Sequence, residues 1–215
     1  MIAPVSVQKR LIGLGLGLGL VLGLSGCITL FPKTKPIQLY RFGVEAKGEA
    51  ANPAQAMVPI LKGSTLFNRA ASGDKILTMT GQKSAYIADA RWYDSASTLF
   101  DAALVNSFAQ GEGPARLIRS GDGASAVLNL RLDVRAFEVR YPDRGRKPTA
   151  AVNIQALLVD SSSRTIIAQN LFDCDQAADA NRVSKIVDAL DRAVTDCQAK
   201  IVTWTNATLA TMPKR

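Results

Sequence analysis

The sequence predicts an α+β fold in which a mixed, mostly antiparallel β-sheet carries two helices packed on one face. Apolar and polar residues alternate strictly from Leu128 to Ala136, which is typical of a strand with one buried face. Apolar residues recur at three- and four-residue steps in segments 95–110 and 179–204, which is typical of amphipathic helices. Helices at only two places in a mostly antiparallel strand order favour the α+β class.

The first 26 residues have the layout of an export signal. A basic pair at 9–10 precedes an uncharged run that closes with the small residues and cysteine of 24–27. This ending resembles a bacterial lipobox, in which the peptide is cut between Gly26 and Cys27 and the cysteine thiol is acylated. The alternative is a transmembrane helix, because the run is long enough to cross a bilayer. Alternating Leu and Gly over 13–20 weaken a helix and favour the cleaved signal.

Three segments follow from this layout. We predict a lipoprotein signal peptide over 1–26, a tether with prolines at 32 and 36 over 27–36, and one folded domain over 37–215.

The sequence of the first half of the domain predicts strands, a hairpin and one helix. Gly81 lies in the short connection expected to turn the hairpin, Asp94 or Ser95 is expected to cap the helix, and Gly111 to end it. The expected elements are a strand over 37–42, a surface loop over 45–55, a short segment over 57–61, hairpin strands over 75–80 and 84–88, a helix to Gln110 and a strand over 115–119.

The second half predicts a three-stranded meander and a long helix. Phe137 and Val139 fall on the opposite parity to the preceding alternation, which a bulge near Ala136 explains. The expected elements are a strand from Leu128, a turn over 142–145, a strand over 152–158, a turn over 160–163, a strand over 165–172 and a helix from about Asp179 to Trp204.

The composition excludes several kinds of chemistry. The chain has no histidine, which removes Ser-His-Asp and Cys-His catalysis and the commonest zinc ligand. Its 26 basic residues outnumber its 18 acidic residues, for a formal net charge of +8. The basic residues are dispersed and accompany no nucleic-acid-binding motif. The basic excess is therefore consistent with anionic lipid or an acidic partner rather than nucleic acid, and ordinary solubility charge is the alternative. We expect no metal.

With Cys27 acylated, two cysteines remain. Cys174 and Cys197 can pair in an oxidising compartment. If Cys174 ends a strand and the helix starts at Asp179, Cys197 lies about 27 Å along that helix. A disulfide then requires the helix to start late, bend or cross steeply, and a buried apolar Cys197 is the alternative.

Several sequence features together resemble the ABC-type transport auxiliary lipoproteins, the PqiC-like (YmbA-like) family. The resemblance covers nearly the whole mature chain, but no single motif is sharp. The features are Ala90, Arg91 and Trp92 opening the first helix, Phe100 to Phe108 within it, the strand residues Leu130, Leu132 and Phe137, the pair Leu171 and Phe172, and Ile201 to Trp204 ending the last helix.

The resemblance implies a fold, a role and a set of partners. It implies a TolB N-terminal-like fold and a periplasmic, lipid-anchored accessory protein of an MCE/ABC-type system that moves phospholipid between membranes. The implied partners are an MCE-domain substrate-binding protein, an ABC permease and its ATPase, with self-association also compatible. It implies no catalytic residues and no cofactor beyond the N-terminal lipid, palmitate included. Ile28 in place of Asp after the acylated cysteine favours the outer over the inner membrane.

Two clusters are candidates for contact with a partner or a membrane. Trp92 and Tyr93 are an aromatic pair of the kind that dominates binding hot spots. The alternative is that an aromatic residue at this junction between a strand and a helix closes the core. The second cluster is a basic hairpin tip, with a solvated tip as the alternative; its residues are Arg140, Arg144, Arg146 and Lys147.

Two other functions compete with the accessory role. One is a periplasmic lipid-binding carrier or chaperone with its own hydrophobic groove between sheet and helices. The other is an envelope hydrolase, which would have to use carboxylates such as Asp133 or Glu138.

Overall fold

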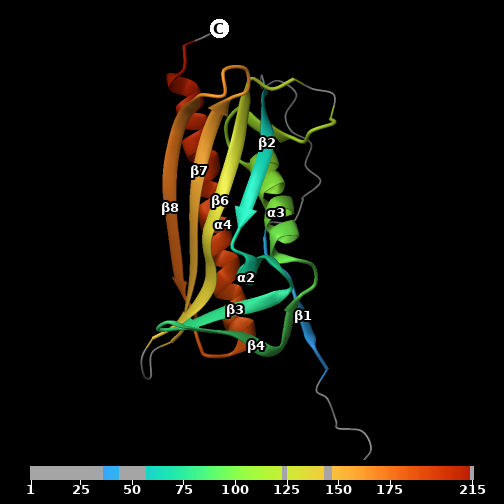
Figure 1. The fold of residues 1–215 in the computed structure, drawn as a ribbon, viewed down its shortest axis with the longest axis vertical. Coiled ribbons are helices and arrows are strands. Elements are labelled where there is room, and N and C mark those ends of the chain that lie inside the picture. The colour runs from blue at the N-terminus through green and yellow to red at the C-terminus, as the bar shows by residue number, and fades with distance from the viewer. Residues whose placement is uncertain (1–35, 44–56, 123–124, 143–146, 214–215) are drawn as a thin grey trace, which may run out of the picture. The chain divides into compact units, whose positions relative to one another are not determined.

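The computed structural model describes residues 36–43, 57–122, 125–142 and 147–213. The folded unit is Ile37–Arg215. Within its described residues, eight strands form one mixed sheet, with helices packed against one face (Figure 1). The α+β class is confirmed, and so is the expectation that the two main helices share a face of the sheet.

The sheet is built around one long strand, β6 (Leu128–Tyr141). Along one edge it pairs antiparallel with β7 (Thr149–Asp160), which pairs in turn with β8 (Ile166–Ala177). Its other edge is divided between two parallel partners, β2 (Val58–Phe67) and β3 (Lys75–Thr80). The sheet therefore branches at β6.

The predicted bulge in β6 allows both halves of this long strand to direct apolar side chains into the core. Its pairing with β7 shifts between Val134 and Ala136, so Phe137 and Val139 return to the buried face. The opposite face carries Arg131, Asp133 and other polar side chains and is covered by neither main helix. One face of the meander thus belongs to the core and the other to solvent.

The remaining strands extend the branched edge. β3 and β4 (Lys83–Trp92) form the predicted hairpin, and β1 (Gln38–Tyr40) lies parallel to the last residues of β4. β5 (Ala115–Ile118) lies parallel to the start of β2. In Figure 1, β3 and β4 run across one end of the domain, from β1 to the end of β6.

Two long helices cover the buried face. α3 (Ala96–Gln110) is capped by Ser95, whose hydroxyl accepts from the backbone N–H of Thr98, so Ser95 rather than Asp94 is the N-cap. α4 (Val183–Thr211) packs along β7 and β8 and against α3. A short helix, α2 (Arg69–Ser72), connects β2 and β3 and was not predicted.

Several predicted boundaries are wrong, two of them at the starts of the helices. Ala90, Arg91 and Trp92 end β4 and do not open a helix, because Ala90 and Trp92 alternate with Arg91 and both point into the core. The last helix begins at Val183 and not near Asp179. The predicted loop over 45–55 lies outside the described residues.

The core lies between the sheet and the two long helices. Its largest fully buried side chains come from both layers, and they include Ile60, Phe100, Phe108, Leu130, Ile154, Leu190 and Ile201. Gln198 is a buried polar residue within it: its amide donates to the carbonyl of Phe100, and its side-chain oxygen accepts from the hydroxyl of Ser107. This buried pair of hydrogen bonds fixes α4 against α3.

Candidate functional site

The predicted anchoring residues, Gly26 and Cys27, lie outside the described residues. The first described strand, β1, begins at Gln38, so the anchor and the domain are close in sequence. Among the described helices, none is long and apolar enough to cross a membrane.

The prediction of Trp92 as a contact residue is wrong. Its side chain is 2% exposed and packs edge-on against Phe42, with ring centroids 4.8 Å apart, and against Phe137 at 6.2 Å. It therefore closes the core where β1 and β4 meet and is not available to a partner. The indole N–H has no hydrogen-bond partner among the described residues.

Tyr93, the next residue, is on the surface. Its side chain is 60% exposed, and its backbone N–H donates to the carbonyl of Tyr40 on β1. It lines a hollow of about 160 Å³ together with Arg41, Gly43 and residues of α3. Tyr93 remains a candidate contact residue.

The structure describes only half of the predicted basic tip. Arg140, at the end of β6, is paired with Glu138 at 3.0 Å and lies 3.9 Å from the Asp175 carboxylate. Lys147 is exposed and has no ion pair with a described residue. Arg144 and Arg146 lie outside the described residues. The tip thus offers Lys147, while two neighbouring carboxylates already neutralise Arg140.

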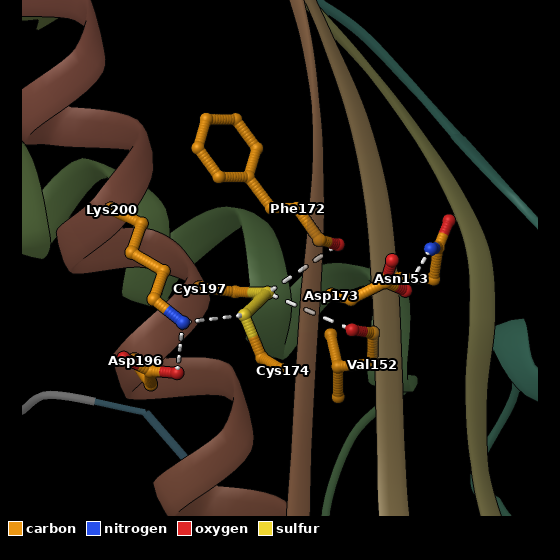
Figure 2. The surroundings of a disulfide bond; sticks show 8 residues. All are labelled: Val152, Asn153, Phe172, Asp173, Cys174, Asp196, Cys197 and Lys200. Carbon is orange, nitrogen blue, oxygen red and sulfur yellow. Dashed lines mark hydrogen bonds and ion pairs between the residues drawn. A yellow bond between two sulfur atoms is a disulfide. The ribbon is translucent and has the colours of Figure 1, made fainter.

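The structure joins Cys174 and Cys197 in a disulfide that ties α4 to β8 (Figure 2). The Cα atoms are 5.7 Å apart, and both side chains are buried. The Cys197 sulfur also lies 3.7 Å from the carbonyl oxygen of Val152, a van der Waals contact because a disulfide sulfur carries no hydrogen. The expected long separation of the two cysteines is wrong, because β8 continues to Ala177 and α4 starts four residues later than expected.

A polar rim separates this disulfide from solvent. Lys200 extends over Cys174, with its ammonium nitrogen 3.9 Å from the sulfur and 2.7 Å from the Asp196 carboxylate (Figure 2). On the far side of the sheet, Asn153 donates to Asp173. These contacts surround the disulfide, and the described residues include no third cysteine that could exchange with it.

The carboxylates considered for hydrolysis do not form a pair. Asp133 and Glu138 lie on opposite sides of the β6 bulge, and each accepts from an arginine two residues away, Arg135 at 3.4 Å and Arg140 at 3.0 Å. No group of acidic, cysteine or histidine side chains in the described ranges is arranged to hold a metal.

Asp160 is the described acidic group with a marked shift in pKa. It is 1% exposed at the β7–β8 turn. The hydroxyl and backbone N–H of Ser162 and the backbone N–H of Ser163 donate to its carboxylate, which lowers the pKa of Asp160 well below its usual range. These hydrogen bonds hold the turn and leave the carboxylate no role as an acid near neutral pH.

Three hollows on the described surface differ from the groove that a lipid carrier requires. One of about 290 Å³ lies between the end of α3 and α4, one of about 440 Å³ lies beside Lys62 and Asp101, and the third is the hollow at Tyr93. None of the three is lined by an apolar side chain of the sheet. They therefore do not supply a hydrophobic groove between sheet and helices.

Solved structures show the same fold. The crystal structure of protein XCC0632 from Xanthomonas campestris is 22% identical, with a TM-score of 0.68, over 80% of this chain and 97% of that chain. The hypothetical protein CT253 from Chlamydia trachomatis is 8% identical, with a TM-score of 0.53, over 73% of this chain and 100% of that chain. At these identities, the likeness concerns the fold alone.

A curated relative covers a smaller part of the sequence. Protein bll6063 of Bradyrhizobium diazoefficiens, uncharacterized by its name, is 25% identical over 118 residues, which are 55% of this chain and 31% of the relative. The chain thus spans about a third of the length of the curated relative that it matches.

The fold defines a two-layer α+β domain in which helices cover one face of a mixed sheet. More particularly, the chain belongs to the family of ABC-type transport auxiliary lipoprotein components, whose model matches residues 41–202. The family's description gives its members an auxiliary role in ABC-type transport. The resemblance noted from the sequence is confirmed at this level.

Proposed function

We propose that this protein is a periplasmic, lipid-anchored accessory component of an MCE/ABC-type system that moves phospholipid between membranes. The observation that carries the proposal is the family match over 41–202, directly downstream of the lipobox-like residues 24–27. Acyl chains on Cys27 would hold the domain to a membrane, since two or three chains give stable anchoring where one is marginal. Ile28 after the cysteine supports the outer membrane.

The proposed role is binding and docking rather than catalysis. Support comes from Asp133 and Glu138, which already accept from arginines on an open sheet face. The proposed partners are the MCE-domain substrate-binding protein, the permease and the ATPase of the same system. Tyr93 and Lys147 are the described residues that we propose for contact with a partner or a membrane, and self-association is part of this proposal.

Genetic interaction tests the role. We expect a strain that lacks this protein and a strain that lacks the MCE-domain protein to show the same sensitivity to detergent, and a strain that lacks both to be no more sensitive than either. Additive sensitivity would place the two proteins in separate processes and contradict the proposal. Full restoration by a Cys27→Ala variant that stays soluble in the periplasm would contradict the requirement for the anchor.

A further inference from the structure

The end of the domain formed by β1 and the β3–β4 hairpin has an exposed surface of apolar and basic side chains. We infer that this end, called here the tether-end surface, rests on the anionic bilayer that holds the acylated Cys27. The inference rests on the proposed lipid anchor and adds an orientation of the domain on the membrane.

The apolar part of this surface lies on β1 and on the residue before it. Ile37 is 57% exposed and Leu39 is 65% exposed, whereas Tyr40 packs against the core. Burial of such side chains removes apolar area from water, and exposed apolar groups that lie together mark contact sites. Ile37 and Leu39 are among the first residues of the domain. They are therefore among the described residues nearest in sequence to the proposed lipid anchor at Cys27.

The length of chain before β1 limits the distance to the membrane. Nine residues separate Cys27 from Ile37. A chain extends by at most about 3.6 Å per residue, so Ile37 lies within about 36 Å of the acylated cysteine. The tether therefore limits the distance between β1 and the lipid surface, whatever conformation it adopts.

Basic side chains lie beside the apolar pair. Leu39 is opposite Arg91 on β4, and Arg91 is opposite Lys75 on β3, so the three share one face of the sheet. Arg91 is partly neutralised by Asp74, 3.7 Å away. Lys75 has no ion pair with a described residue, and its ammonium group lies 5.2 Å from the centre of the Tyr86 ring.

Strand pairing extends this basic surface to the other side of the domain. Thr80 is opposite both Lys83 and Tyr141, so the β3–β4 turn lies next to the end of β6 and to the segment that carries Lys147. Lys83 and Lys147 are exposed and, like Lys75, have no ion pair with a described residue. Figure 1 shows β3 and β4 running across this end of the domain, from β1 to β6.

The charges on this end favour lipid headgroups over an acidic protein patch on a mobile partner. Besides the paired Asp74, the exposed acidic residues in and just after β4 are Asp89 and Asp94, against three lysines that have no ion pair with a described residue. Basic residues held at a membrane surface are attracted to anionic headgroups over a distance of about one Debye length, roughly 10 Å. The lipid anchor keeps the surface within about 36 Å of the headgroups at all times, which is not true of a diffusing partner.

Photocrosslinking to lipid tests the orientation. The full-length acylated protein, carrying benzoylphenylalanine at Ile37 or Leu39, is reconstituted in phosphatidylcholine vesicles with and without phosphatidylglycerol and with a clickable phospholipid. The chain offers two matched controls. Ile166, 58% exposed, begins β8 at the end of the meander that is far from Thr149. Leu66, 62% exposed, lies on the outer face of the sheet.

We expect several-fold more lipid adduct at Ile37 and Leu39 than at Ile166 and Leu66, and a further increase with phosphatidylglycerol that Lys75→Gln, Lys83→Gln and Lys147→Gln together remove. Equal yields at all four positions on an acylated protein would overturn the orientation while leaving the anchor in place. Adducts to protein instead of lipid at Ile37 and Leu39 in native membranes would also overturn it. A mass spectrum without acyl chains on Cys27 would instead overturn the anchor itself.

Discussion

Trp92 and Tyr93 are neighbours in the sequence, but their side chains contact different surroundings. Trp92 is buried among Phe42 and Phe137, whereas Tyr93 is 60% exposed. The sequence alone did not separate them because the boundary between strand and helix was placed too early to assign a strand face to Trp92. Alternation of Ala90, Arg91 and Trp92 was the available signal.

Truncation of the two aromatic side chains should separate their roles. Trp92→Ala should lower the free energy of unfolding by about 3 to 5 kcal/mol, because it removes a large buried side chain and leaves a cavity. Tyr93→Ala should change it by less than about 1 kcal/mol, as is usual for an exposed position. Urea denaturation measures both. Similar losses in the two variants would contradict the assignment.

At Asp160, hydrogen bonding to the carboxylate predicts a dependence of stability on pH. The pKa of Asp160 is lowered in the folded state, so its contribution is present above the unfolded-state pKa of about 4 and is lost as the pH falls below that value. Thermal midpoints measured between neutral and acid pH should therefore fall less steeply for Asp160→Asn than for the wild-type protein. Parallel curves for the two proteins would show that this carboxylate contributes no pH dependence.

At the scale of elements, the longer and more regular segments were predictable. The meander, the β6 bulge, α3 and the course of α4 follow from periodicities of two and 3.6 residues. β2 was predicted too short, because Pro59 and Gly63 interrupt its pattern and Gly63 sits in an irregular register against β6. A Cβ at Gly63 would lie 2.1 Å from the Asn129 side-chain oxygen. Glycine is therefore needed here because β2 and β6 approach each other closely, and no local sequence pattern predicts this approach.

β4 was also predicted too short, for a related reason. Asp89 has a φ of 55°, within the stretch where the pairing of β4 with β3 shifts register. A left-handed residue breaks the alternation that identifies a strand. The parallel pairings of β1 with β4 and of β2 with β6 join segments distant in sequence, and such partners cannot be read from local patterns.

The disulfide between β8 and α4 should contribute strongly to stability. Its cysteines are 23 residues apart in the sequence, and closing a loop of this size restricts the unfolded chain by about 3 kcal/mol. The Cys174→Ala/Cys197→Ala variant should lose about this amount in urea denaturation. The wild-type protein unfolded in the presence of dithiothreitol should behave like the variant, and equal stability of the variant and the oxidised protein would contradict the prediction.

Close packing of the segment after β1 against α3 should make Gly43 intolerant of substitution. Gly43 has a φ of +97°, and a Cβ there would lie 2.3 Å from the Ala103 Cβ. Gly43→Ala should cost about 2 kcal/mol or more, from left-handed strain together with overpacking. Gly73→Ala is the matched control, since Gly73 has a φ of −83° and no atom within 4 Å of an added Cβ. A thermal midpoint unchanged by Gly43→Ala would contradict this packing.

At the scale of the whole molecule, the fold separates the core from its surfaces. The helices cover one face of the sheet, the other face carries polar side chains together with exposed leucines such as Leu66, and the tether-end surface carries exposed apolar and basic side chains. The sequence pattern predicted which residue types would be exposed. It could not predict that Lys83 lies next to the basic tip, because this proximity depends on the parallel pairing of β3 with β6.

The identity of the proteins that contact the domain in its own membrane tests the proposed role most directly. Membranes that contain the full-length protein with a C-terminal affinity tag can be crosslinked, solubilised and analysed by mass spectrometry for peptides joined to the domain. We expect the MCE-domain protein to be the main crosslinked partner, with the permease and ATPase of the same system recovered beside it. Reproducible crosslinks to other envelope proteins, with no component of an MCE/ABC-type system among them, would contradict the proposed role.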